Sequence, residues 1–97
     1  MNHATFADFE SAARAEGFDE VLERVWAPGQ VLETHSHPFE VRAQVVQGEV
    51  QLTCGEQTRQ LRAGEGFELA HGVPHAERYG AQGATFWVAR RHQPGGA

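Results

Sequence analysis

Residues 29–48 read GQVLETHSHPFEVRAQVVQG, a segment in which two histidines stand between two glycines. Gly29 lies six residues before His35, and Gly48 lies eleven residues after His37, each at a place where a hairpin has to turn. His35 and His37 are two residues apart in a predicted strand, so their side chains project from one face. They can converge on one metal ion, but an H-x-H pair alone also fits two exposed histidines on a sheet edge.

A second segment, GEGFELAHGVPHAERY at residues 64–79, carries another histidine, His75, just after a Gly-x-Pro turn. Glu77 and Tyr79 follow His75 at a spacing of two, so in a continuing strand all three side chains share one face. Glu77 is then a candidate general base or ligand-orienting carboxylate, and Tyr79 is a candidate hydrogen-bond donor. The alternative places Glu77 in water at the mouth of a barrel and Tyr79 in the core. We expect His71, in the turn, to be exposed.

Outside these segments the chain alternates short apolar stretches with Gly and Pro turns, a rhythm typical of an all-β sandwich or barrel. A helix is predicted first, over residues 6–16, because Thr5 suits an N-cap and Gly17 a C-terminal stop. Eight strands are predicted at residues 20–26, 30–37, 41–47, 49–54, 57–61, 66–70, 75–79 and 84–91.

Together the two segments resemble the two motifs of the cupin family. Their patterns are Gly29-x5-His35-x-His37-x10-Gly48 and Gly64-x5-Ala70-x-Gly72-x2-His75-x3-Tyr79. The resemblance covers about residues 27–91. It implies a small single-domain cupin over residues 1–97, a double-stranded β-helix or jelly-roll barrel at about residues 18–91. We expect residues 92–97 to form a flexible tail.

The resemblance also implies a metal site at His35, His37 and His75. Three neutral imidazoles suit one divalent transition-metal ion, which could be Fe, Mn, Zn, Ni or Cu, and they leave coordination positions free for water or substrate. The alternative is a degenerate cupin whose histidines are only polar lining. The family normally places a glutamate ligand where this chain has Val41, and Glu40 stands one residue earlier. Glu40 is a possible ligand only if a bulge turns it inward, and we expect a solvated turn acid instead.

Two functions remain open on this pattern. The first is a metal-binding cupin that acts on a small organic molecule, as a metal-dependent oxygenase or isomerase. The all-histidine ligand set resembles the iron sites of thiol dioxygenases and diketone-cleaving dioxygenases, in ligand type only. The second is a non-catalytic cupin module that binds or senses a ligand. Val41, Ala43 and Val45 share one strand face, which predicts a mostly apolar cavity for either function.

Composition limits the partners and the cellular location that are expected for the protein. The net charge is −5 and the eight cationic side chains, all arginines, are scattered, which argues against nucleic acid as a partner. Cys54 is the single cysteine, so no intrachain disulfide is possible and a cytoplasmic location is the default. The sequence shows neither a signal peptide nor an apolar run of about 20 residues that could span a membrane. We expect a homodimer, with the aromatic residues within residues 6–26, namely Phe6, Phe9 and Phe18, at the contact, and the alternative for Phe6 and Phe9 is packing of the helix on the barrel.

Overall fold

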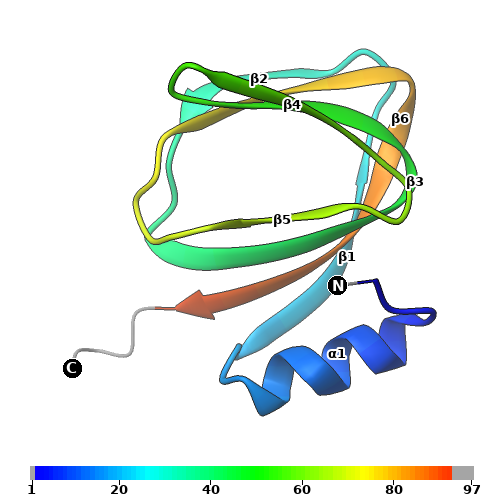
Figure 1. Cartoon of the computed structure of the whole chain (residues 1–97), viewed down its shortest axis with the longest axis vertical. Coiled ribbons are helices and arrows are strands. Elements are labelled where there is room, and N and C mark those ends of the chain that lie inside the picture. Colours follow the sequence, from blue (N-terminus) through cyan, green and yellow to red (C-terminus); the bar gives the residue numbers. More distant parts are fainter. Residues whose placement is uncertain (1, 93–97) are drawn as a thin grey trace.

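The computed structural model describes residues 2–92, and it shows one helix followed by a set of antiparallel strands. The strands wrap around a common interior, and the helix lies beneath them (Figure 1). This arrangement confirms the predicted all-β jelly-roll barrel with a short N-terminal helix. The elements are α1 (Phe6–Ala15), β1 (Glu20–Trp26), β2 (Val31–His35), β3 (Phe39–Cys54), β4 (Gln57–Arg62), β5 (Gly66–Leu69) and β6 (His75–His92).

The two longest strands, β3 and β6, each take part in both faces of the barrel. The first half of β3 pairs with β5 and with the last half of β6, which also pairs with β1. The second half of β3 pairs with β4 and with the first half of β6, which also pairs with β2. The barrel therefore has two faces, one in the order β1-β6-β3-β5 and the other in the order β2-β6-β3-β4.

A glycine corner lets β3 pass from one face to the other. Val45 is buried before the corner and Val50 after it, so the buried positions change from odd to even numbers, and the pairing with β6 shifts in register there. Gly48 has a φ of 78°, and a Cβ built on it would lie 2.1 Å from the backbone oxygen of Gly83. The prediction of eight separate strands was therefore wrong in one respect: bulges bend β3 and β6 where breaks were expected.

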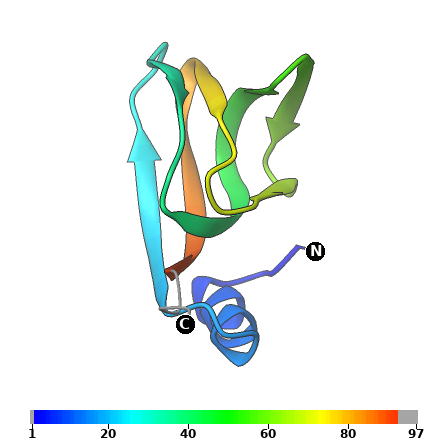
Figure 2. The ribbon, with the colours of Figure 1, turned by 90° about the vertical axis from the view of Figure 1, so that its left-hand side faces the viewer.

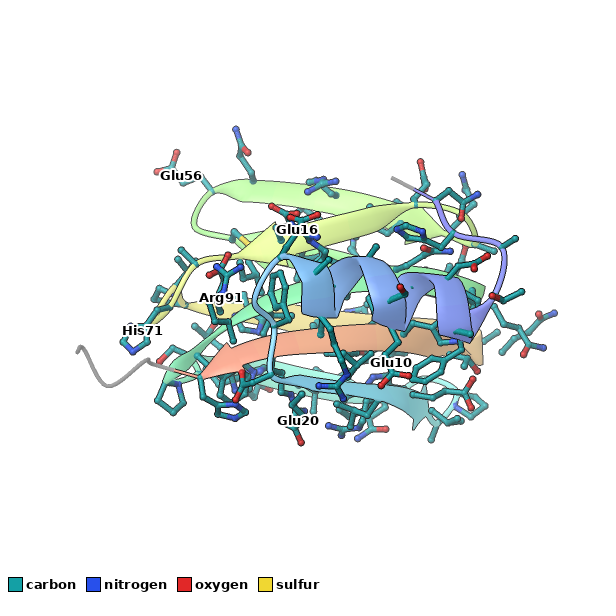
Figure 3. All side chains as sticks on the ribbon, turned by 90° about the horizontal axis from the view of Figure 1, so that it is seen from below. Glu10, Glu16, Glu20, Glu56, His71 and Arg91 are labelled. Atoms are coloured by element: carbon teal, nitrogen blue, oxygen red, sulfur yellow. The ribbon has the colours of Figure 1, made fainter. Side chains whose placement is uncertain are left out.

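Two groups of buried residues hold the molecule together. The larger lies inside the barrel, where Val45, Val50 and Leu52 are its largest fully buried side chains. The smaller joins α1 to the outer side of β6 through Phe9, Ala13, Phe18 and Ala89. Figure 2 and Figure 3 show α1 packed across this side of the barrel.

The aromatic residues of the N-terminal segment pack against other residues of the same chain. Phe9 and Phe18 are each only 2% exposed, and the ring of Phe6 lies 6.0 Å from that of Trp87. Phe9 and Phe18 therefore follow the alternative in which the helix packs on the barrel, because α1 uses its apolar face to cover the sheet, and their rings are not available to a partner. The homodimer and the cytoplasmic location stay predictions, and most of the predicted tail lies outside the described residues. No helix within residues 2–92 is long and apolar enough to cross a membrane.

We expect Gly48→Ala to lower the free energy of unfolding by more than about 3 kcal/mol, because left-handed backbone strain adds to a clash with backbone. Gly29→Ala is the matched control, since Gly29 also has a positive φ of 68° but no atom lies within 4 Å of the position that a Cβ would take there. It should cost about 1 kcal/mol. Urea denaturation of both variants measures the difference, and equal losses would contradict the importance of the close contact.

Candidate metal centre

Three histidines, from β2, from β6 and from the connection between β2 and β3, meet at one end of the barrel. His35 ends β2, His75 begins β6, and the two residues are direct partners in the strand pairing. His37 lies in the connection between β2 and β3. One nitrogen from each ring can be chosen so that all three lie within 4.8 Å of one another. Because two ligands at about 2.1 Å from an ion lie at most about 4.2 Å apart, small side-chain rotations are enough to bring the set onto one ion.

The backbone fixes which nitrogen of two of these rings faces the others. Nδ1 of His35 lies 2.7 Å from the backbone oxygen of Glu33, and Nδ1 of His75 lies 3.0 Å from that of Val73. A carbonyl oxygen only accepts hydrogen bonds, so each Nδ1 carries the proton and donates it. The free electron pair is then on Nε2 in both neutral rings. Metal-binding histidines use this arrangement, in which the outer nitrogen is anchored and the inner one is available.

The surroundings of the third histidine, His37, favour its neutral form. Burial lowers the pKa of His37 most strongly, and the positive charges of the neighbouring imidazoles and of Arg90 and Arg24 lower it further. A neutral imidazole offers an electron pair to a metal ion, whereas a protonated one does not. The chemistry of all three rings therefore fits a divalent transition-metal ion.

Glu77 and Tyr79 face the same site from β6. They lie on the strand face that carries His75, as their spacing of two residues predicts. Oε2 of Glu77 lies 3.4 Å from Nε2 of His75 and 3.7 Å from Nε2 of His35. The hydroxyl of Tyr79 donates to the other carboxylate oxygen, Oε1. Glu77 is only 8% exposed, so the alternative is wrong in placing it in water at the barrel mouth, whereas Tyr79 does belong to the buried core, as that alternative had it.

Burial raises the pKa of Tyr79 far above its ordinary value, and the hydrogen bond to Glu77 with the charge of that carboxylate raises it further. The phenol therefore stays protonated and acts as a hydrogen-bond donor. It holds one oxygen of Glu77 and leaves the other facing the imidazoles.

Two other predicted residues lie away from this cluster. Glu40 forms an ion pair with Arg91, at 2.6 Å between Oε1 and Nη1, and does not line the cavity next to the histidines. His71 is exposed in the loop before β6 and projects outward from the edge of the molecule (Figure 3).

A cavity of about 170 Å³ opens beside the three histidines, between the two faces of the barrel. Its walls are mainly apolar and include Val41, Phe86 and Val88. Two arginines, Arg24 and Arg90, also line it, and neither was predicted from the sequence. The alternation of β1 could have revealed Arg24, because Leu22 and Trp26, two residues to either side, pack against the core.

The chain belongs to the cupin family. The family profile described as the cupin domain matches residues 22–88, which include both histidine segments. A comparison with curated proteins finds no match.

Solved structures with the same fold support this assignment. A structure from a study of the DMSP lyases RdDddP and RnDddQII is similar with a TM-score of 0.70 at 23% identity, over 79% of this chain and 40% of that one. DMSP lyase DddQ from Ruegeria pomeroyi DSS-3 gives 0.65 at 26% identity, over 79% and 39%. A cupin superfamily protein from Desulfitobacterium hafniense DCB-2 gives 0.64 at 15% identity, over 78% and 81%. The chain thus spans about two fifths of the lyase chains.

The state of Tyr79 gives a spectroscopic prediction, since it is the only tyrosine in the chain. The folded protein keeps the phenol protonated, whereas the unfolded chain releases the proton near the ordinary pKa of 10.0. Stability from this group is therefore complete below that pH and falls as the pH rises above it. Phenolate absorbance, followed together with circular dichroism, should appear only as the protein unfolds. Protein unfolded in urea is the control, and phenolate formation near pH 10.0 in the folded state would contradict the burial of Tyr79.

Proposed function

We propose that this cupin binds one divalent transition-metal ion through His35, His37 and His75 and holds a small organic molecule at the open coordination positions. The observation that carries the proposal is a buried group of atoms with free electron pairs, formed by the histidine Nε2 atoms and the Glu77 carboxylate. Nε2 of His35 and Nε2 of His75 both face the Glu77 carboxylate at 3.7 and 3.4 Å. With both Nδ1 atoms engaged by backbone oxygens, neutral rings leave no hydrogen between these atoms.

Such a group of electron pairs is costly to bury unless something positive lies among them. A proton on one imidazole would satisfy one contact with Glu77 and would leave the other ring unsatisfied. A divalent ion attracts all three imidazoles and the carboxylate at once. The metal ion is therefore the occupant that best fits the complete group.

We further propose that Glu77 and Tyr79 are the catalytic pair of an enzyme, an oxygenase or an isomerase. A bound ion would polarise an oxygen or sulfur atom of the organic ligand and so make a nearby proton easier to remove. Oε2 of Glu77 faces this position and can accept that proton, while Tyr79 keeps the carboxylate oriented through Oε1. Relatives of the same fold include proteins named as lyases, which supports an enzymatic role.

We expect His37→Ala to lower the metal content of the purified protein sharply, because divalent affinity depends on the number of ligands. His35→Ala and His75→Ala should produce matching losses. Elemental analysis of protein purified without added metal, followed by titration with a competing chelator, measures both content and affinity.

Two matched controls test the choice of ligands. His71→Ala removes an exposed imidazole four residues from His75, and Glu40→Gln removes the charge of a carboxylate that pairs with Arg91. Both should leave the metal affinity nearly unchanged. Unchanged metal content in His37→Ala would refute the three-histidine site, and a tenfold loss in Glu40→Gln, about 1.4 kcal/mol, would show that Glu40 is a ligand.

Turnover separates an enzyme from a non-catalytic ligand-binding or sensing module. The iron-loaded protein is tested for oxygen uptake with thiols, diketones and phenols, and each compound is also tested for binding and for isomerisation. A catalytic Glu77 requires that Glu77→Gln abolish turnover while the compound still binds. Binding without turnover in the unmodified protein would favour the module.

A further inference from the structure

The two arginines of the cavity are each fixed by a stack of aromatic rings that ends at the metal centre. The guanidinium carbon of Arg24 lies 4.4 Å from the ring centroid of Trp26. The ring of Trp26 is stacked on that of Tyr79, with centroids 5.2 Å apart and planes 18° from parallel. Tyr79 in turn donates its hydrogen bond to Glu77. Arg24 is therefore positioned by the same contacts that orient the proposed catalytic carboxylate.

A second stack holds the other arginine. The guanidinium carbon of Arg90 lies 5.0 Å from the ring centroid of Phe39. Phe39 is stacked on His37, with centroids 4.8 Å apart and planes 11° from parallel. Cations held against aromatic faces lose little further freedom when they bind a ligand. Both positive charges are thus held in place beside the cavity.

Two buried hydrogen-bond donors of the residues in this wall lack acceptors. Nε1 of Trp26 and Nε of Arg90 are both buried, and neither has a hydrogen-bond partner within the part of the chain that the structure describes. Arg24 takes part in none of the ion pairs formed by residues 2–92. Buried donors without partners are rare because each costs about 1–3 kcal/mol. The residues Trp26 and Arg90, which carry these two donors, line one cavity together with Arg24, so a ligand there would meet a wall rich in donors and poor in acceptors.

The chain itself neutralises these arginines only weakly. Nη1 of Arg90 lies 3.4 Å from Oε1 of Glu20, whose side chain is 43% exposed. An exposed pair at this distance is screened by water. Glu77 also lines the cavity, but its two oxygens are directed to Tyr79 and to the histidines. The wall that carries Arg24 and Arg90 therefore keeps an excess of positive charge although the whole chain has a net charge of −5.

We propose that the ligand of this cavity is a small organic anion, a carboxylate with a short hydrocarbon part. Its carboxylate oxygens accept hydrogen bonds from the guanidinium groups of Arg24 and Arg90. Its hydrocarbon part contacts the apolar wall formed by Val41, Phe86 and Val88. The volume of about 170 Å³ is below the roughly 300–1,000 Å³ of sites for drug-sized ligands, so the molecule has only a few carbon atoms. The inference rests on the proposed function only in placing this ligand next to the metal ion.

The test compares carboxylates with their own amides, which match them in size and lack the charge. Acetate, 2-hydroxypropanoate and 3-methylbutanoate are each titrated against the corresponding amide by calorimetry, with the metal content of the protein measured. At least one carboxylate should bind at least about tenfold more tightly than its amide, since hydrogen bonds to charged groups contribute about 1.5–3 kcal/mol. Arg24→Gln and Arg90→Gln should each remove most of this preference, and Arg90→Lys should restore part of it. Arg78→Gln is the matched control, because Arg78 is an exposed residue of β6 outside this cavity.

The outcomes separate this inference from the metal site. Equal binding of every carboxylate and its amide, or no binding tighter than a Kd of about 10 mM, would overturn the anion site. A preference that survives in both Arg24→Gln and Arg90→Gln would overturn it as well. A preference that is present in protein shown to bind no metal would sustain the anion site and refute the proposed function. Thermal unfolding of each variant shows whether a lost preference reflects lost folding.

Discussion

The close contact of two backbones at the corner of the barrel is the constraint on which the rest of the structure depends. At Gly48 a side chain would occupy the position of the backbone oxygen of Gly83, and both glycines have a positive φ. Because β3 bends there and changes phase, it presents apolar side chains to the interior on both sides of the bend. β6 changes phase as well and presents His75, Glu77 and Tyr79 to the interior before the bend and Phe86 and Val88 after it. Without that change of phase, either half of these strands would turn its apolar side chains outward. The corner thus makes one core from two faces.

The same construction gives the cavity two chemically different walls. The face built on β2 and the first half of β6 carries His35, His75 and Glu77, which offer electron pairs. The opposite face, built on β1 and the last half of β6, carries Arg24 and Arg90, which offer protons for hydrogen bonds. A ligand between these walls would meet the cluster of histidines on one side and the cationic donors on the other. The apolar side chains around it lower the local dielectric, so both interactions are stronger than they would be in water.

Local sequence patterns predicted much of this arrangement, and their limits have physical causes. The spacing of His75, Glu77 and Tyr79 predicted a shared face because strand periodicity is a local property. Gly48 lies at a bend within β3 and not at a strand end, and the sequence alone could not show this because the backbone that approaches it closely, at Gly83, is distant in the sequence. Arg24 was missed for a related reason, since an arginine in an alternating strand is normally assigned to the solvent side. The stacking of Arg24 on Trp26 and the closure of the barrel around it arise only in the tertiary structure.

The residue at position 41 connects the unusual features of this site. Cupin motifs like the one in this chain normally carry a glutamate there, and Val41 is paired directly with Arg90 across two antiparallel strands. Directly paired side chains lie about 5 Å apart, so a carboxylate at position 41 would be placed to neutralise Arg90. Valine leaves that guanidinium without this partner, and within the cavity lining the carboxylate comes instead from Glu77, on the opposite face. The excess of positive charge around Arg90 therefore follows from the presence of a valine, and not a carboxylate, at position 41.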